Sequence, residues 1–493
     1  MRPSARTTVA VASSDGGNAD RRARHSGPWR VAVSASLATA LAACATYTQA
    51  PIDPTQTAAA FAARRLDAPA LREDVERVLP SAASGAWPPP EWDRAELLAV
   101  ALARNGSLAV ARAEVEAALA AEITAGEAPN PTLGLQSEYA RREADHWLYG
   151  ISFDFLLPRH RTLDVRLAAL GTGGARAELM EKTWSVRRAM TRALSDRESA
   201  RRRLAILTKL AGSQDTLVAL VRRRVAAGED APSDLTSAET ARIEIEQQLG
   251  AARADAAAAD AALSAALGLP LSAIEGVAIE WPDWGDPPPL GESDLDAARE
   301  QALLARADLA VAISDYAAAE TKLERAIARQ YPQFEFRPGY YWDHGIAKWP
   351  FDVGLTLPLF NRNRGEIAEA TAVRELAGRR LLALQADIYG EIEAAVRAED
   401  VARANLEAAR RRGEAARQQL EHAEVALQLG ASDRAEHTSA EVLALRAELE
   451  IVQAEAERQA ARNALEDALH APLSGPELAL ATPPRAADSG VGP

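Results

Sequence analysis

Short motifs recur in one order, at a nearly constant displacement of 200 to 202 positions, along this chain of 493 residues. They are LAVA at 108–111 and 309–312, proline at 131 and 332, LP at 157–158 and 357–358, glycine at 228 and 430, and SAE at 237–239 and 439–441. A fixed period of this kind indicates an internal duplication. We therefore expect two copies of one architecture, joined by a proline- and tryptophan-rich linker at 268–294.

Long stretches without proline predict very long helices in both halves. No proline occurs in residues 163–231 or 359–471, and helices of ordinary globular proteins are much shorter than these stretches. An apolar seam with steps of three and four residues covers 238–266, and its counterpart at 440–468 is apolar except at Arg458. Alanine dominates both seams, so neighbouring helices can approach closely. A helix of about 65 residues would be about 100 Å long, which suits a tunnel or a stalk.

Two segments in each half alternate between apolar and other residues, which predicts β-strands. They lie at 133–139 and 149–157 in the first half and at 334–340 and 351–359 in the second. Strands of about nine residues are long enough to cross a membrane at a tilt. Ordinary hairpins on a water-soluble domain are the alternative interpretation. Four strands cannot close a membrane barrel, so the membrane interpretation requires several copies of the chain.

The N-terminus has the pattern of a bacterial export signal. Four arginines at 21–30 precede an uncharged run at 31–43 that is too short to span a bilayer. The run ends in Leu-Ala-Ala before Cys44, the only cysteine of the chain, which resembles the lipobox of bacterial lipoproteins. We expect a signal peptide at 1–43 and lipidation of Cys44. Ala45 follows in place of the aspartate that retains such lipoproteins at the inner membrane, so the outer membrane is favoured.

Composition and motif content exclude several functional classes. The chain has 70 acidic and 56 basic residues and a formal charge of −14, which disfavours nucleic-acid binding. One cysteine and seven scattered histidines provide neither a disulfide framework nor zinc-finger spacing. No nucleophile elbow, phosphate-binding glycine loop or HExxH motif occurs. We expect no enzyme activity, no cofactor and no metal site, and His160, His422, His437 and His470 are interpreted as ordinary polar positions.

Two stretches carry a family resemblance. They are PNPTL at 129–133, before the first strand, and VGLTLPLFNRNRGEIAEA at 353–370, at the last junction of strand and helix. Both resemble the TolC family of outer-membrane efflux channels, and the second resembles its cobalt–zinc–cadmium efflux branch. The first half has LPRHR at 157–161 in place of LPLFNRNRG, so the branch assignment depends on the second half. With the duplication, the resemblance covers residues 90–472.

The resemblance implies a mainly α-helical fold with a small β-barrel contribution: a coiled-coil tunnel of long helices and four membrane strands per chain, internally duplicated. It implies a homotrimer with a shared barrel of about twelve strands, located in the outer membrane and extending into the periplasm. The implied partners are a periplasmic adaptor of the membrane fusion protein class, an inner-membrane proton-driven pump and outer-membrane lipid. The implied function is passive conduction, with divalent heavy-metal cations as the cargo of this branch.

The turns of the two helical hairpins contain the candidate functional residues. Glycine can end the first helix of each hairpin, and serine or aspartate can cap the second. The resemblance implies that these turns are the periplasmic gate and adaptor-docking tips, although turn formation alone is the simpler interpretation for Gly228, Gly430 and Ser233. Threefold symmetry would convert inward-facing acids into rings that attract cations. The candidates are Gly228, Glu229, Asp230, Gly430, Ser432, Asp433 and Glu436.

The connections between the strands contain Asp145-His146-Trp147 and Asp343-His344. Histidine with aspartate can bind a metal, but one of each does not complete a site. Solvated loops with interfacial aromatic residues are therefore favoured.

The expected domain organisation is a signal peptide at 1–43, a lipidated N-terminal segment at 44–92, a first repeat at 93–267, the linker at 268–294, a second repeat at 295–471 and a flexible tail at 472–493. Two functional alternatives stay open. The same fold can serve as a multidrug or type I secretion channel, and a lipid-anchored coiled-coil structural protein without a pore would need no alternating strands.

Overall fold

The computed structural model describes residues 47–80, 85–141, 146–156, 160–343 and 345–478. The predicted signal peptide, Cys44, Asp145, His344 and the junction at 157–159 lie outside the described residues. The chain divides into two compact units, Met1–Ala58 and Ala59–Pro493. In the first unit the described residues are 47–58, where helix α2 (Pro54–Ala62) begins.

One order of elements occurs twice in the second unit: two helices, antiparallel strands and a long helical hairpin. The first half contains α4 (Arg94–Arg104), α5 (Gly106–Gly126), β1 (Thr132–Ala140), β2 (His146–Leu156), α6 (Arg161–Ala227) and α7 (Pro232–Leu267). The second contains α8 (Glu292–Ala305), α9 (Ala307–Ala328), β3 (Gln333–Asp343), β4 (Ile346–Lys348), β5 (Phe351–Thr356), α10 (Arg364–Gln428) and α11 (Arg434–Leu469). Helix α3 (Pro69–Val78) precedes α4, and the linker contains the short helix η2 (Leu271–Ala273).

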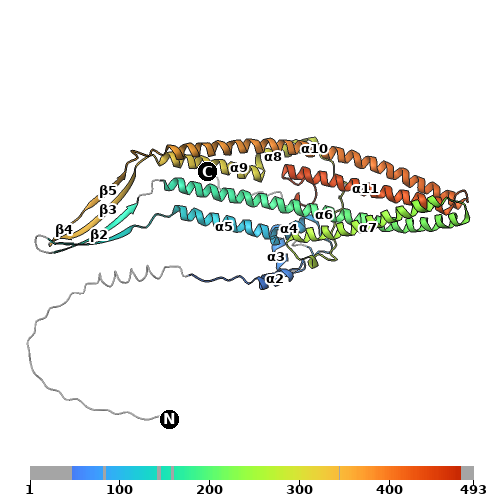
Figure 1. Cartoon of the computed structure of the whole chain (residues 1–493), viewed down its shortest axis with the longest axis horizontal. Coiled ribbons are helices and arrows are strands. Elements are labelled where there is room, and N and C mark those ends of the chain that lie inside the picture. The colour runs from blue at the N-terminus through green and yellow to red at the C-terminus, as the bar shows by residue number, and fades with distance from the viewer. Residues whose placement is uncertain (1–46, 81–84, 142–145, 157–159, 344, 479–493) are drawn as a thin grey trace, which may run out of the picture. The chain divides into compact units, whose positions relative to one another are not determined.

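The predicted long helices are confirmed. Helices α6 and α10 have 67 and 65 residues, and each packs along a partner, α7 or α11, of 36 residues. The predicted seam faces the partner helix: its buried members on α7 are Ala238, Ile245, Ala252, Ala259, Leu263 and Ala266, and those on α11 are Ala440, Ala447, Ala454, Arg458, Leu465 and Ala468. In the second unit the strands lie at one end of these helices and the hairpin turns lie at the other (Figure 1).

The strands form one antiparallel sheet in the order β1-β2-β3, with β4 and β5 both paired to β3. The fourth predicted strand, at 351–359, begins at the predicted residue but was wrong at its end, because β5 ends at Thr356. The short strand β4 precedes it and is separated from it by Trp349 and Pro350. Pro350 and Pro358 lack the backbone N–H that a strand donates to its neighbour, so pairing is interrupted at the first and has stopped before the second.

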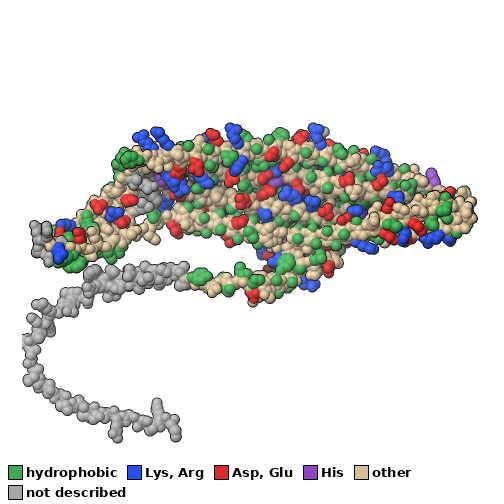
Figure 2. All heavy atoms as spheres, in the orientation of Figure 1, with side chains coloured by type: hydrophobic (Ala, Val, Ile, Leu, Met, Phe, Trp, Pro, Cys, Tyr) green, Lys and Arg blue, Asp and Glu red, His purple; other side chains and the backbone are tan. Residues whose placement is uncertain are grey.

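The largest hydrophobic core lies where the short helices and the linker pack on α6. It joins Leu71 of α3, Leu97 of α4 and Met190 of α6 to Trp281 and Trp284 of the linker, all of them buried. Trp92 also forms a parallel bridge with Ile279 of the linker. The linker is therefore part of the packed bundle. On the face seen in Figure 2, acidic and basic side chains are interspersed along the helices.

Candidate functional site

The sheet has one apolar face, and strands from both repeats build it. Cross-strand partners lie on the same side of an antiparallel sheet, and the register pairs Leu133 with Phe153 and Phe336 with Val353. Apolar side chains continue over this face on β1, β2, β3 and β5. The large ones that are 40% to 74% exposed are Leu133, Leu135, Tyr139, Trp147, Tyr149, Ile151, Phe153, Phe155, Phe334, Trp342, Phe351, Val353 and Leu355.

Polar groups occupy the opposite face of the same strands and interact with one another. The Tyr341 hydroxyl donates a hydrogen bond to Gln136 Oε1 at 2.8 Å, and Arg337 forms an ion pair with Asp154. Soluble monomers rarely expose an apolar patch as extensive as the apolar face of this sheet. One lipid-compatible face and one polar face are what the wall of a membrane barrel requires.

A left-handed glycine closes the first hairpin turn, between α6 and α7. Gly228 has a φ of 79°, and the Glu229 N–H donates to the Arg224 carbonyl oxygen at 2.9 Å. Pro232 then begins α7, where the missing N–H is not needed. The candidates Gly228, Glu229 and Asp230 thus form the turn between the end of α6 and the start of α7.

The second turn, between α10 and α11, is held by a side-chain cap. Asp433 accepts a hydrogen bond from the Glu436 N–H at 2.8 Å, which satisfies a donor at the start of α11. The Ser432 hydroxyl donates to Glu436 Oε2 at 2.7 Å. Gly430 has a φ of 70°. Each of these candidates therefore has a local structural role in the turn.

One arginine joins the two turns. Arg224, in the last turn of α6, donates to Asp230 at 2.9 Å and also forms an ion pair with Asp433 of the other hairpin. The hydrogen bond to Asp230 raises the pKa of Arg224, and the charges of Asp433 and Glu229 act in the same direction. The turns, more than two hundred positions apart, are thus tied to each other. Sequence reasoning missed Arg224, although a basic residue in the last turn before an acidic loop is a recognisable signal.

The connection between β3 and β4 has local polar contacts. Asp343 forms an ion pair with Lys348 at 2.7 Å, and Trp349 packs edge-on against Tyr340 at 4.9 Å between ring centroids. Trp342 and Trp349 are exposed. These contacts agree with a solvated loop bearing aromatic residues.

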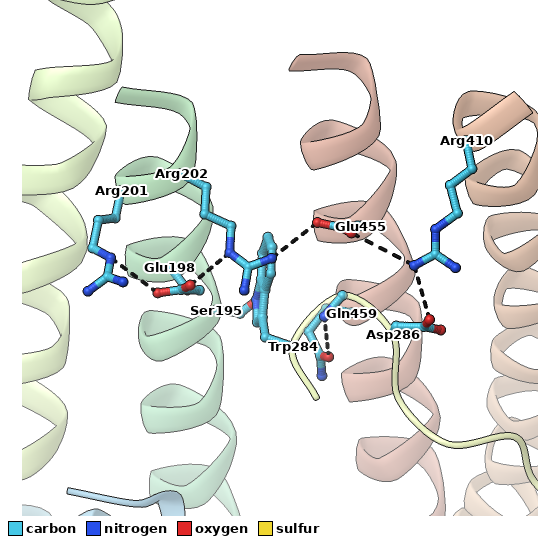
Figure 3. Close-up of polar contacts among 10 residues, drawn as sticks. Ser195, Glu198, Arg201, Arg202, Trp284, Asp286, Arg410, Glu455 and Gln459 are labelled. Atoms are coloured by element: carbon cyan, nitrogen blue, oxygen red, sulfur yellow. Dashed lines mark hydrogen bonds and ion pairs between the residues drawn. The ribbon is translucent and has the colours of Figure 1, made fainter. Parts of the chain in front are cut away.

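The linker crosses the bundle near its middle and is held by residues of three long helices. In Figure 3, Trp284 lies against α6, where its indole N–H donates to Ser195 Oγ at 3.1 Å and the Arg202 guanidinium lies 4.5 Å from its ring centroid. The Gly285 N–H donates to Gln459 Oε1 of α11 at 3.4 Å. The linker backbone is therefore fixed against both repeats.

Asp286 continues this contact to α10 and α11. It accepts from Arg410 at 3.0 Å and forms a second ion pair with Arg458 (Figure 3 draws the first). Burial alone would raise the pKa of Asp286, but the hydrogen bonds from the two arginines outweigh it and lower the pKa. Burial raises the pKa of Glu455, which Arg202 and Arg410 contact at 3.2 and 3.8 Å from opposite sides. The network is thus one connected set of charges across α6, α11, α10 and the linker.

A buried cluster fixes residues 472–478, which follow α11. Arg187 of α6 contacts Glu466 at 2.6 Å and Glu477 at 2.9 Å, and the three side chains are 5% exposed or less. Arg94 donates to the Ser474 carbonyl oxygen at 3.3 Å. The described start of the segment predicted as a tail therefore packs against α4 and α6.

His470 lies in a more confined place than its sequence context suggested. It follows α11 with a φ of 49°, and its side chain is 9% exposed. Its ring stacks on Trp184 of α6 at 5.2 Å between centroids. Glu181 and Asp308 lie beside it, so the ligand atoms of all three residues are within 4.8 Å of one another. His470 is therefore more confined than an ordinary surface histidine.

Residues 298–470 match the family model described as Outer membrane efflux protein. The second repeat resembles this family. No protein of curated function shows significant sequence similarity to the chain.

Several solved structures have the same fold. CusC has a TM-score of 0.62 at 18% identity, covering 76% of this chain and 91% of its own. The outer-membrane protein VceC from Vibrio cholerae has 0.62 at 19% identity, covering 77% and 96%. The outer-membrane channel OprN has 0.64 at 17% identity, covering 86% and 99%. The predicted fold class, mainly α-helical with a small sheet in the manner of TolC-like channels, is confirmed.

Proposed function

We propose that this protein is an outer-membrane efflux channel that conducts its substrate passively. The observation that carries the proposal is the two-faced sheet, with exposed apolar residues on one side and hydrogen-bonded polar residues on the other. This division suits a barrel wall with lipid outside and water inside. The match of 298–470 to the Outer membrane efflux protein family supports it.

The functional assembly in this proposal is a homotrimer. The sheet of one chain has open edges at β1 and at β4 and β5, and an unpaired backbone group in lipid costs several kcal/mol. Pairing between copies removes these edges. Three chains, each with β1, β2, β3 and the interrupted fourth strand, would close a barrel of about twelve strands.

The long helices would form the periplasmic tunnel, with the hairpin turns at its pump-facing end. A helix with the length of α6 extends about 100 Å, enough to reach far into the periplasm. There Gly228, Glu229, Asp230, Gly430, Ser432, Asp433 and Glu436 would form the gate and the docking tips for a periplasmic adaptor, which connects to an inner-membrane proton-driven pump. Lipidation of Cys44 would anchor the mature chain in the outer membrane.

Divalent heavy-metal cations are the proposed cargo. The support is the resemblance of 353–370 to the cobalt–zinc–cadmium branch, together with the acidic residues of the turns, which would favour cations at the tunnel mouth. A multidrug or type I secretion channel is the alternative with the same fold. Metal and drug sensitivity of a deletion strain would separate these cargoes.

The deciding experiment is conductance of the full-length protein purified from outer membranes in mild detergent. Oligomeric mass is measured first, and the protein is then reconstituted in planar bilayers. Both the wild type and an Arg224→Ala variant are used, because the variant removes the ion pairs that join the two turns. A trimer with discrete conductance steps is expected.

A monomer that never conducts, in either form, would overturn the proposal. It would favour the lipid-anchored coiled-coil structural protein without a pore. The exposed apolar face of the sheet already speaks against that alternative, because a spacer in water has no use for it.

A further inference from the structure

Three potential metal ligands converge at the junction between the two repeats. Glu181 belongs to α6 and Asp308 to the first turn of α9, and His470 directly follows α11 as its C-cap. His470 Nδ1 lies 3.7 Å from Glu181 Oε2, and the nearest ligand atoms of all three residues lie within 4.8 Å of one another. Two donors on one tetrahedral metal are about 3.3–3.6 Å apart. Small side-chain adjustments would therefore bring the three atoms to one ion.

The histidine is confined by its neighbours. Its side chain is 9% exposed, and Trp184 stacks on one side of the ring. Its Nδ1 lies 3.7 Å from Glu181 Oε2, so one ring nitrogen lies beside the carboxylates of the cluster.

Glu181 leaves an acceptor unsatisfied beside this ring. Its Oε2 is buried, and no hydrogen-bond donor contacts it in the part of the chain that the structure describes. Buried polar atoms without partners are few in folded proteins, and an absent ion is one reason for them. Asp308, the third ligand, is oriented by Arg306, whose Nη2 lies 2.7 Å from Oδ2. That contact fixes the carboxylate as an outer-shell partner does at a metal site.

The surrounding cavity has room for an ion with its water, and its charge suits a divalent cation. It has a volume of about 620 Å³. Four carboxylates line it, from Glu181, Asp308, Glu391 and Asp467, against the guanidinium groups of Arg188 and Arg306. With all of these groups ionised, the lining has an excess of two negative charges, which a divalent cation would balance.

We propose that Glu181, Asp308 and His470 form a binding site for a divalent transition-metal ion of the zinc class, with water completing the coordination. One imidazole nitrogen and two carboxylate oxygens suit Zn²⁺ or Co²⁺ better than Ca²⁺ or Mg²⁺, which prefer oxygen ligands only. Because α6 belongs to the first repeat and α9 and α11 to the second, a bound ion clamps the two repeats together. The site is structural, and the proposal is independent of the channel's conductance and cargo.

The test uses full-length protein in detergent, purified without a histidine tag and stripped with a chelator. Co²⁺ alone is titrated while its visible absorption is recorded, and Zn²⁺ is then added as a competitor. The site variants are Glu181→Gln, which keeps the side-chain shape, and His470→Asn, because asparagine tolerates the positive φ of this position. Glu178→Gln on α6 and His422→Asn on α10 are the matched controls, since both residues are exposed and outside the cluster.

The expected result is one Co²⁺ per chain with an absorption band that Zn²⁺ removes. Both site variants should bind at least about tenfold more weakly, whereas both controls should bind as wild type does. Zn²⁺ should raise the melting temperature of wild type and controls but not of the site variants, whose melting in chelator shows that they are folded. Absence of stoichiometric binding, or unchanged binding by folded Glu181→Gln, would overturn the site. Conductance is recorded separately, so either proposal can fail alone.

Discussion

Arg458 of α11 forms an ion pair with Asp286 of the linker, at the one position where the apolar seam of the second repeat is interrupted. The Arg458 side chain is 6% exposed and donates from Nη2 to the Pro287 carbonyl oxygen at 3.0 Å. Glu399 of α10 lies 3.9 Å from its Nε. The interruption is therefore the place where the linker docks.

Replacing Arg458 with leucine would complete the apolar seam and yet destabilise the protein. The change removes the cation nearest to the buried Glu399 carboxylate and leaves Arg462 as its remaining positive neighbour. Breaking a buried pair costs about 3–5 kcal/mol. Because Asp286 is half exposed, we expect a somewhat smaller loss, about 2–4 kcal/mol in chemical denaturation. Arg412→Leu is the control: it breaks an exposed pair with Glu450 and should change stability by at most about 1 kcal/mol. Equal stability of the two variants would refute this role of Arg458.

Gly285→Ala should detach the linker from α11. Gly285 has a φ of 80°, and a Cβ there would lie 2.6 Å from Cβ of Glu455, which is too close. Gly276→Ala is a matched control, since Gly276 has a φ of 74° with nothing within 4 Å of the added atom. Both variants carry the backbone strain of about 1–2 kcal/mol, and only Gly285→Ala adds a clash. A lower denaturation midpoint for Gly285→Ala than for Gly276→Ala is expected, and identical midpoints would contradict it.

The long helices could be predicted because their causes are local. Absence of proline, alanine-rich seams and glycine at the turns act within a few residues of one another, and the duplication allowed each half to check the other. Strand alternation was equally local, and it placed the apolar face correctly. The fourth strand ends earlier than its alternation predicts, because Pro358 lacks the N–H donor that would continue the pairing.

Contacts between distant segments could not be predicted in this way. Arg224 with Asp433, Arg458 with Asp286, and the cluster of Glu181, Asp308 and His470 each join residues more than a hundred positions apart. No periodicity links such partners, and a charged residue at a seam position or a lone histidine after a helix has many possible environments. Their meaning depends on how the two repeats and the linker pack, which only the fold determines.

Leu135→Arg should prevent insertion of the sheet into the outer membrane. Leu135 lies near the middle of β1 on the apolar face and is 74% exposed, and an arginine on the lipid face near the midplane costs about 2–4 kcal/mol per chain. Gln136→Arg is the adjacent control, because Gln136 lies on the polar face. We expect the amount of trimer in outer-membrane fractions to fall for Leu135→Arg and to change little for Gln136→Arg. The reverse order would mean that the faces are assigned the wrong way round.

Removing the tie between the turns should increase channel opening without unfolding the protein. Arg224→Ala frees both Asp230 and Asp433, and ion pairs that water screens contribute little to stability. Asp433→Ser tests the other partner, because serine keeps a cap for α11 while removing the charge. Both variants should raise the open probability in planar bilayers. Arg222, on the same helix as Arg224, forms an exposed pair with Glu239 of α7, and Arg222→Ala should leave gating unchanged. A similar rise in open probability for Arg222→Ala would mean that the loss of a positive charge alone causes the effect.

The stability of the protein should depend on pH through Asp467. Burial raises the pKa of Asp467 to about 6, although the positive charges of Arg188 and Arg187 act in the opposite direction. The folded state holds this proton more tightly than the unfolded chain, so the stabilisation is complete below about pH 4 and is lost as the pH rises through 6. Because asparagine does not titrate, Asp467→Asn should not lose stability as the pH rises through 6. Because the side chain keeps some contact with water, we expect the variant to be about 1–2 kcal/mol more stable than wild type at pH 8 and equal to it near pH 4. Denaturation is measured with a chelator present, and Asp400→Asn, at an exposed ion pair with Arg403, is the control. A constant difference between Asp467→Asn and wild type across this range would exclude Asp467 as the titrating group.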